Sequence, residues 1–293
     1  MGILVTGASG FTGRALCAAL HAQGQTVYGL SQRMPAVTPW HSYACDLRHS
    51  AHVDELMQQL RPHALVHLAA RSFVDDSDYL GFYDHNVVAT THLLEAARCH
   101  GVQRVLVASS ANVYGVPAAD ALPLSESAPL QPVNHYGASK LAMEHIARTY
   151  AEDFALTITR PFNYTGPGQA AYFLIPKLAA HFAQRKPSIN LGNLDIARDY
   201  TSIDDVVQAY LMLLDCEAAA GHTVNICSGR VSSLQQLLDL FTQLSGHQLQ
   251  VHSQAQFVRR HDIAVLSGDY SLLHQLCGWQ PRQSIPDLLQ SML

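Results

Sequence analysis

The chain contains 293 residues, of which 48% are hydrophobic and 14% are charged, and its formal net charge is -5 at pH 7. These values predict a protein with a sizeable core, formed by one large domain or by a domain with an appended lobe. The negative net charge indicates no basic surface for nucleic acid. The sequence itself shows no apolar run near the ~20 residues that a membrane-spanning helix needs.

The N-terminus, the cysteines and the histidines bear on location and metal binding. The sequence opens on the strand-like segment MGILVTG, so we expect no signal peptide. The six cysteines are widely spaced without a CxxC pair, as expected for reduced side chains in a cytoplasmic protein. Among the 17 histidines, His63 and His67 are four residues apart, but on a predicted strand, so we expect no metal site.

The first half alternates short apolar strands with helices. Strands are predicted at 3–5, 26–30, 65–68, 105–107 and 156–159, and helices at 13–23, 53–60, 90–100 and 138–152. Strands that are apolar on both faces and separated by helices indicate a parallel sheet covered on both sides. The expected fold is therefore α/β, with a doubly wound parallel sheet of the Rossmann type.

This regular pattern ends after Pro161, where a turn-rich stretch follows. Further elements are expected as helices at 171–184 and 203–214, strands at 189–191, 197–201 and 223–227, and two or three C-terminal helices. We predict that residues 1–162 and 200–228 form a nucleotide-binding domain. Residues 163–199 and 229–293 are then expected to form a smaller, discontinuous α/β lobe that binds the substrate.

A glycine-rich stretch, GASGFTG, joins the first predicted strand to the first helix. Gly7, Gly10 and Gly13 permit a tight turn, a close approach of the backbone to a pyrophosphate, and close packing of the helix on the strand. The helix N-terminus offers unpaired N–H groups to the anion. A plain glycine turn is the alternative, but the position between strand and helix favours a dinucleotide site.

The end of the second strand bears on the choice of dinucleotide. An NAD site usually has a carboxylate there, which accepts a hydrogen bond from the ribose 2′-hydroxyl. This chain reads Ser31-Gln32-Arg33 instead, and Ser31 and Arg33 could hold a 2′-phosphate. The missing carboxylate therefore favours NADPH, although a solvated arginine is the alternative interpretation of Arg33.

Tyr136 and Lys140 lie four residues apart at the start of a predicted helix, so they share one helix face. Positive charge from Lys140 and from an oxidised nicotinamide is expected to lower the pKa of the tyrosine. A YxxxK pair alone occurs often by chance. Combined with the glycine stretch and a serine at a strand end, it indicates an oxidoreductase site.

Together these motifs resemble the extended short-chain dehydrogenase/reductase family, the NAD-dependent epimerases and dehydratases that modify nucleotide sugars. The resemblance covers nearly the whole chain and includes the segments 7–13, 46–47, 67–70, 86–87, 109–115, 136–140 and 160–163. It implies that Ser110, Tyr136 and Lys140 are the catalytic residues.

The resemblance also implies a set of cofactor contacts. Asp46 would contact the adenine, and Ala69 and Ala70 at the end of the HLAA strand would line the cofactor site. The full expected set is Gly7, Ser9, Gly10, Phe11, Thr12, Gly13, Ser31, Arg33, Asp46, Leu47, Leu68, Ala69, Ala70, Asn86 and Lys140.

The C-terminal half resembles the GDP-mannose-pathway members of the family through the stretches 160–169 and 191–200. By this resemblance Asn163 and Arg198 would bind the diphosphate, because a guanidinium fits phosphate oxygens through paired N–H donors. The expected substrate contacts are Ser72, Asn112, Tyr136, Asn163, Lys177, Arg198 and Arg260.

Two of these arginines have open alternatives. Arg260 belongs to a segment that resembles an RPxD motif, but His261 stands at the position of the proline. Arg198 precedes Asp199, and a local ion pair between them is the alternative interpretation of that dipeptide.

The residue at position 112 distinguishes the reactions of this family. Sugar 4,6-dehydratases need an acid/base beyond the Ser–Tyr–Lys set and carry a Glu two residues before the tyrosine of the VYG stretch. The epimerase-reductases that form GDP-fucose carry a Cys there. Asn112 has no useful proton affinity near neutral pH, although it can hydrogen-bond a substrate hydroxyl or carbonyl. The expected reaction therefore needs only hydride transfer and one proton.

We therefore expect an NADPH-dependent reduction, with NADH as the alternative cofactor, of a GDP-linked 4-keto-6-deoxy sugar. The resemblance is closest to GDP-4-keto-6-deoxy-D-mannose reductases, which form GDP-D-rhamnose for surface polysaccharides. A 4-epimerase, a dehydratase that uses Asp75, Asp76 or His135, and an NADPH-sensing scaffold remain open. The family commonly dimerises through a four-helix bundle, which predicts a homodimer through helices around 86–100 and 136–152.

Overall fold

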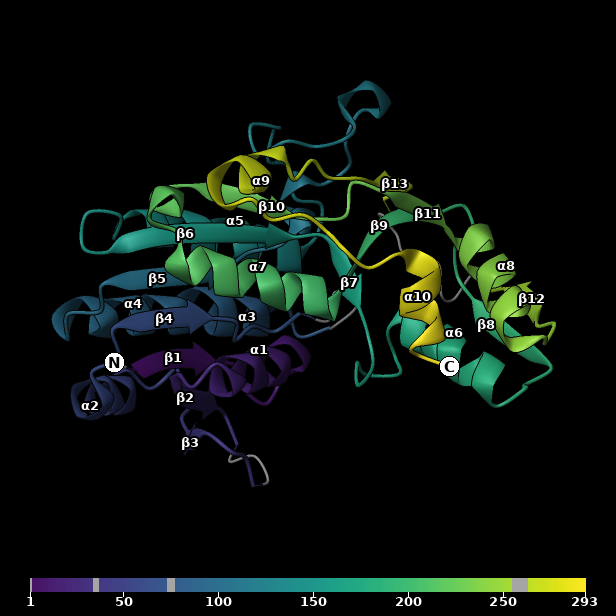
Figure 1. Ribbon diagram of the computed structural model, residues 1–293. Helices are drawn as coiled ribbons and strands as arrows, with labels where there is room; N and C mark the ends of the chain where they lie inside the picture. Colours follow the sequence, from purple (N-terminus) through teal and green to yellow (C-terminus); the bar gives the residue numbers. More distant parts are fainter. Residues whose placement is uncertain (1, 34–36, 73–76, 255–262) are drawn as a thin grey trace.

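A seven-stranded sheet forms the centre of the protein in the computed structural model (Figure 1). The structure describes residues 2–33, 37–72, 77–254 and 263–293. All neighbouring strands of this sheet are parallel. Their order is β10 (Thr223–Ile226), β6 (Ala155–Pro161), β5 (Arg104–Ala108), β4 (Ala64–His67), β1 (Gly2–Thr6), β2 (Thr26–Ser31) and β3 (His41–Ala44).

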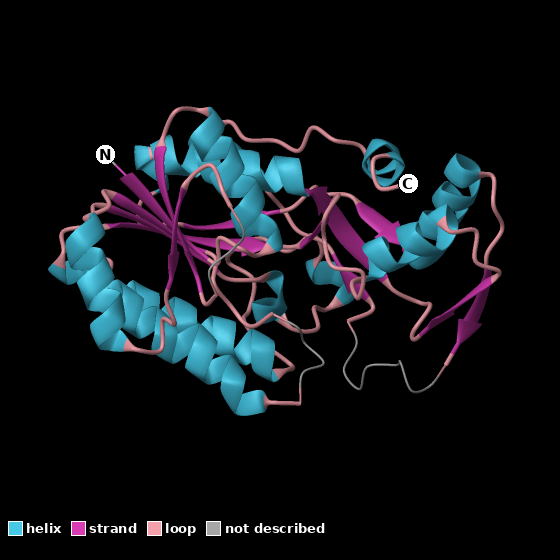
Figure 2. Ribbon diagram, turned by 90° about the horizontal axis from the view of Figure 1, so that it is seen from below, coloured by secondary structure: helices cyan, strands magenta, loops and turns pink. Residues whose placement is uncertain are grey.

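Helices cover both faces of the sheet because its inner strands are apolar on both sides (Figure 2). Along β1, Ile3 and Val5 belong to one hydrophobic cluster, whereas Leu4 belongs to the opposite one. The first cluster includes α1 (Phe11–Ala22), α7 (Ile203–Asp215) and α9 (Ser271–Cys277). The second includes α2 (Ser50–Leu60), α4 (Ala89–Cys99) and α5 (His135–Arg148), and α4 follows α3 (Tyr79–Tyr83) and a π-helical turn (Asp84–Val88).

A smaller lobe lies beyond the carboxyl ends of the strands (Figure 1). Its apolar core is formed mainly by α6 (Leu174–Ala183), α8 (Leu234–Ser245) and α10 (Ile285–Gln290). A four-stranded sheet joins β11 (Val231–Ser233), β9 (Ala197–Ser202), β13 (Val265–Leu266) and β7 (Asn163–Thr165), and a separate pair joins β12 (Gln250–Ser253) to β8 (Ser188–Leu191). Within the described residues no helix is long and apolar enough to cross a membrane.

The predicted doubly wound α/β fold is confirmed, and the predicted helices begin and end within a few residues of the observed ones. The short strands β3, β7, β11, β12 and β13 were not predicted, because segments of two to four residues carry little periodicity. Helix α9 and Trp279 belong to the segment 229–293, which we predict to lie in the smaller lobe. In the structure they pack instead on a face of the large sheet.

The strand order places a ligand site between β1 and β4. From β1 the chain proceeds to β2 and β3 on one side, and then returns to β4, β5 and β6 on the other. In doubly wound sheets, ligands bind outside the carboxyl ends of the strands at this reversal. The carboxyl ends of these strands face the smaller lobe (Figure 1).

Trp279 is expected to be a main source of stability for the helical layer that contains α7 and α9. Its side chain is 1% exposed, and its indole N–H donates to the Asp205 carbonyl oxygen at 3.0 Å. Trp279→Ala should lower the free energy of unfolding by about 3–5 kcal/mol in urea denaturation, because it opens a large cavity. Leu80→Ala, at a 76% exposed position, is the control and should change it by less than about 0.5 kcal/mol. Equal effects of the two variants would contradict the packing role.

Candidate active site

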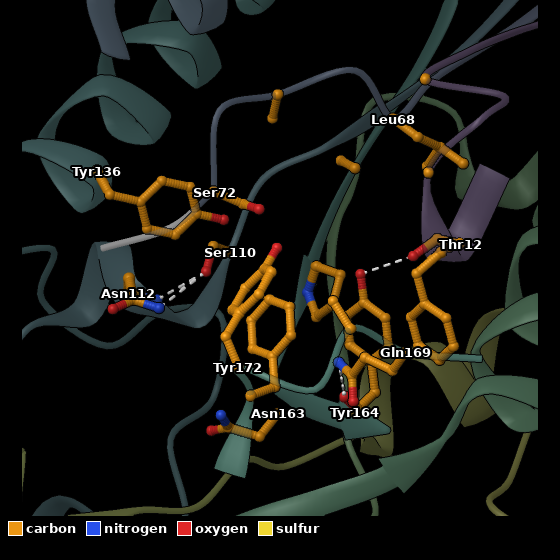
Figure 3. A pocket seen from close by; sticks show the side chains of 18 of the residues that line it. Thr12, Leu68, Ser72, Ser110, Asn112, Tyr136, Asn163, Tyr164, Gln169 and Tyr172 are labelled. Carbon is orange, nitrogen blue, oxygen red and sulfur yellow. Dashed lines mark hydrogen bonds between the residues drawn. The ribbon is translucent and has the colours of Figure 1, made fainter. Parts of the chain in front are cut away.

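A large cavity lies between the carboxyl ends of the parallel strands and the smaller lobe (Figure 3). Its volume is about 1980 Å³, roughly twice the upper end of the ~300–1,000 Å³ that a single drug-sized ligand occupies. The predicted site residues that line it are Gly7, Ser9, Gly10, Phe11, Thr12, Gly13, Ser31, Asp46, Leu47, Leu68, Ala69, Ala70, Ser72, Ser110, Asn112, Tyr136, Lys140, Asn163, Lys177 and Arg198. The cavity thus has room for a dinucleotide and a nucleotide sugar together.

Three predicted contacts are not among these lining residues. Arg33 is exposed outside the cavity. Asn86 is fully buried, and its amide bonds to the Ser139 hydroxyl at 2.9 Å and to the backbone N–H of Arg71 at 2.8 Å. Asn86 therefore supports the segment after β4 rather than facing the cavity. Arg260 lies outside the described residues.

The glycine stretch forms a cradle that fits a pyrophosphate. Gly7 has a φ of 70°, which favours glycine, and a Cβ on Gly13 would lie 2.1 Å from the carbonyl oxygen of Gly7. Gly10 precedes α1 and provides no side-chain cap for its first N–H groups. These N–H groups are therefore available to an anion, and the backbone can approach it closely.

The part of the cavity near the ends of β2 and β3 contains an ion pair. Ser31 ends β2, and its hydroxyl accepts a hydrogen bond from the backbone N–H of Ser9 at 2.9 Å. Asp46 pairs with Arg48 at 2.6 Å, and hydrogen bonding to Arg48 holds the pKa of this carboxyl well below its usual range. Asp46 therefore stays ionised, and no carboxylate stands at the end of β2 itself.

Helix α5 carries Tyr136 and Lys140 on the face that lines the cavity. The Lys140 ammonium is buried and donates to the Ala108 carbonyl oxygen at 2.7 Å. Burial lowers the pKa of Lys140 to about 7, although the nearby Glu144 carboxylate opposes this shift.

The pKa of Tyr136 is shifted by its surroundings. Burial raises the pKa of Tyr136 to about 12, and the hydrogen bond to the Ser110 hydroxyl lowers it only in part. The lowering expected from Lys140 together with an oxidised nicotinamide stays a prediction for the complex with that cofactor. In the protein alone Tyr136 stays protonated, as a proton donor must.

Ser110 lies at the end of β5 beside the 3-10 turn Ala111–Tyr114. Its hydroxyl oxygen accepts two hydrogen bonds from Asn112, one from the backbone N–H at 3.2 Å and one from the side-chain Nδ2 at 3.1 Å (Figure 3). Tyr136 and Ser110 point into the same part of the cavity, and Ser72 is also among the residues that line this cavity (Figure 3).

A buried ion pair lies behind α5. Arg160 at the end of β6 donates through Nε and Nη2 to the two carboxylate oxygens of Glu144, at 2.9 and 2.7 Å. Its Nη1 donates to the Tyr114 hydroxyl at 3.1 Å, which in turn donates to Asn225 of β10 at 2.7 Å. This network holds α5, and with it Tyr136 and Lys140, against the sheet.

The lobe contributes side chains to which the sequence assigned no role. The Tyr164 ring stacks on Phe11 with centroids 6.1 Å apart, and its hydroxyl bonds to the Thr12 hydroxyl at 2.8 Å (Figure 3). Gln169 and Tyr172 line the same side of the cavity (Figure 3). The turn-rich stretch 163–169 was the signal available, because a loop between two lobes tends to line the cleft between them.

Two further predictions concern His67, considered for metal binding, and Asp199, considered for a local ion pair. His67 is buried and bonds to the hydroxyls of Thr6 and Thr90 at 2.7 and 2.8 Å, so both of its ring nitrogens have protein partners. Asp199 accepts from the backbone N–H groups of Ser228 and Gly229 at 2.7 and 2.8 Å, which is a different set of partners from the local ion pair considered for Asp199.

The chain is similar to known proteins in both sequence and structure. A sequence model of the NAD dependent epimerase/dehydratase family matches residues 3–227. The chain is 35% identical to a GDP-6-deoxy-D-talose 4-dehydrogenase of Aggregatibacter actinomycetemcomitans, over 100% of this chain and 97% of that protein. It is 32% identical to a GDP-6-deoxy-D-mannose reductase of Pseudomonas aeruginosa, over 99% of this chain and 95% of that protein. The structure of RMD from Pseudomonas aeruginosa complexed with NADPH matches with a TM-score of 0.87 and 31% identity, over 100% and 97% of the two chains.

Arg160 and Arg148 both pair with Glu144 but differ in burial, so their variants test how much burial adds to the contribution of an ion pair to stability. Arg160→Met should lower the free energy of unfolding by about 3–5 kcal/mol, because it leaves the buried carboxylate without its main partner. Arg148→Met removes the other partner, which is 39% exposed, and should cost less than about 1 kcal/mol. Urea denaturation of both variants measures the difference, and similar losses would contradict the assignment of Arg160 as the main partner.

The lowered pKa of Lys140 predicts a pH dependence of stability. The unfolded chain binds a proton at Lys140 up to about pH 10.5, whereas the folded protein releases it near pH 7. Between these values the unfolded state binds more protons, so this group makes stability rise with pH. The wild type should therefore gain stability relative to Lys140→Met from pH 7 to pH 9 in urea denaturation, and a constant difference would contradict the shift.

Proposed function

Because the chain belongs to the NAD dependent epimerase/dehydratase family, whose members act on nucleotide sugars with a nicotinamide dinucleotide, we propose that it is a 4-keto reductase. The substrate we propose is GDP-4-keto-6-deoxy-D-mannose, with NADPH as the reductant and GDP-D-rhamnose as the product. The observation that carries this proposal is the chemistry around Ser110 and Tyr136, where an amide stands in place of an acid/base.

The described residues that line the cavity include one carboxylate, Asp46, and it is paired with Arg48. Beside Ser110 stands Asn112, which cannot remove a proton from carbon at neutral pH. Dehydration and 3,5-epimerisation both require such a proton transfer, whereas reduction of a ketone does not. The chemistry beside Ser110 therefore supports a reductase.

Other candidate bases have limited support. Asp75 and Asp76 lie outside the described residues. His135 lines the cavity, but its ring stacks on Tyr79 with centroids 4.5 Å apart, and its Nδ1 bonds to the Tyr83 hydroxyl at 3.0 Å. We regard His135 as part of the cavity wall.

In the proposed reaction the residues of α5 and β5 act on the carbonyl oxygen at carbon 4. Tyr136 is protonated in its buried site and donates its proton to this oxygen as negative charge develops there. Ser110 donates a hydrogen bond to the same oxygen. Lys140 would hold the ribose of the cofactor, and in its protonated form it favours proton release by Tyr136. When bound, the nicotinamide supplies the hydride.

Several features support a GDP-linked substrate and NADPH. Asn163, Lys177 and Arg198 line the lobe side of the cavity, where a diphosphate would need an amide and cations. Both curated relatives described above act on GDP-linked 6-deoxy sugars by their names. The end of β2 carries Ser31 rather than a carboxylate, and the related Pseudomonas aeruginosa structure holds NADPH. We also propose a cytoplasmic homodimer in which α4 and α5, which are neighbours on one face of the sheet, form the contact.

The similarity to one relative favours a second candidate product, GDP-6-deoxy-D-talose. The relative at 35% identity is named for GDP-6-deoxy-D-talose, the other alcohol at carbon 4. The same three catalytic side chains serve both products, and the orientation of the sugar ring decides which face receives the hydride. The product must therefore be identified by its carbon 4 configuration.

The test is to mix NADPH, the protein and GDP-4-keto-6-deoxy-D-mannose, and to follow the loss of absorbance of the reduced cofactor. We expect stoichiometric oxidation and a GDP-deoxyhexose whose carbon 4 configuration is read by NMR, with NADH slower. Tyr136→Phe should lower kcat by about 10²–10⁴-fold, because it removes the proton donor. Conversion of GDP-mannose to a keto sugar without net NADPH use would instead indicate a dehydratase. Interconversion of two NDP-hexoses would indicate a 4-epimerase.

A further inference from the structure

The hydrogen bonds of Ser110 determine where its own proton can point. A hydroxyl group has one proton to donate and two lone pairs to accept with. Both acceptor directions of the Ser110 oxygen are used by N–H groups of Asn112, the backbone N–H at 3.2 Å and Nδ2 at 3.1 Å (Figure 3). The proton of Ser110 is therefore directed away from Asn112.

Only the second of these bonds depends on the side chain at position 112. The backbone N–H bond is the cap of the 3-10 turn, and any residue except proline could form it. The Nδ2 bond needs a side-chain donor at this distance from the turn, and the amide of Asn112 provides one. A carboxylate of the same shape would accept from Ser110 instead and would draw its proton out of the cavity.

The turn that carries Asn112 is held close to α5. A Cβ at Gly137 would lie 2.6 Å from the carbonyl oxygen of Asn112, so the missing side chain of Gly137 permits this approach. Gly137 directly follows Tyr136, and the side chains of Ser110 and Tyr136 point into the same part of the cavity (Figure 3). The turn and the helix thus present two hydroxyl groups to one place.

We propose that Asn112 is a positioning residue that commits Ser110 to donating its proton to the oxygen at carbon 4 of the substrate. This inference rests on the proposed keto reduction and assigns Asn112 a role through Ser110 rather than direct contact with the sugar. A ketone oxygen can only accept hydrogen bonds, so a committed donor beside the Tyr136 hydroxyl matches it. The two donors bind the oxygen more tightly as its negative charge grows.

Asn112→Asp reverses the polarity of this contact with little change in shape. We expect kcat for keto reduction to fall by about 10–100-fold at pH 8, with KM and the Kd of NADPH within about threefold, because one donor to the transition state is lost. At lower pH the introduced carboxylic acid becomes protonated and can again donate to Ser110. The ratio of wild-type to Asn112→Asp kcat should therefore decrease from pH 8 toward pH 5.

Two matched variants separate this role from a structural one. Asn112→Ala removes the donor without adding an acceptor and should cause a smaller loss that does not depend on pH. In a Ser110→Ala background, Asn112→Asp should cause little further loss of kcat, because its effect acts through the serine. A loss that is the same with and without Ser110, or an Asn112→Asp enzyme as active as the wild type, would overturn the proposal.

If the wild type does not reduce the keto sugar, the proposed function is rejected. The hydrogen bond from Asn112 to Ser110 can still be tested by NMR. In the ¹⁵N-labelled protein, the side-chain amide signal of Asn112 is identified by its absence from Asn112→Asp. This signal should shift when Ser110 is replaced by alanine, because its hydrogen-bond acceptor is removed. An unchanged signal would show that the amide does not bond to Ser110 and would overturn the inference.

Discussion

The buried ion pair between Arg160 and Glu144 fixes the geometry on which the cavity depends. Glu144 lies one turn beyond Lys140 in α5, and Arg160 lies at the end of β6, so their paired hydrogen bonds at 2.9 and 2.7 Å join helix to sheet. Removing one partner would leave a charge in a site of low dielectric, which strongly favours the paired arrangement. Tyr136 and Lys140 therefore project from a helix that cannot easily rotate or slide on the strands.

Burial of Tyr136 and Lys140 determines the protonation of these two side chains. It raises the pKa of Tyr136 to about 12 and lowers the pKa of Lys140 to about 7. A protonated phenol beside a serine hydroxyl makes two donors for one acceptor oxygen. In the proposed reaction the charge that develops on that oxygen is met by donors already in place, so little reorganisation is needed. Burial, the identity of residue 112 and the direction of proton transfer are thus consistent with one another.

Much of the fold and part of the site follow from local sequence patterns. The glycine spacing of residues 7–13 and the four-residue spacing of Tyr136 and Lys140 are properties of a single turn or helix, so both could be predicted. The stacking of Tyr164 on Phe11 joins residues 153 positions apart (164 − 11), and no periodicity reports such a contact. Short strands such as β13, with two residues, are likewise formed by the neighbours they pair with. The raised pKa of Tyr136 could not be predicted either, because it follows from burial, which is a tertiary property.

We propose that the site adds hydride and one proton to a ketone without removing any proton bound to carbon. This can be tested by the NMR spectrum of the product formed from GDP-4-keto-6-deoxy-D-mannose and NADPH in D₂O, with enzyme-free substrate as the reference. We expect protium at carbons 3, 4 and 5 of the product, because the hydride comes from NADPH and Asn112 cannot act as a base. Deuterium at carbon 3 or 5 above the enzyme-free level would instead reveal a base at the sugar, and the proposed keto reduction without such a base would be wrong.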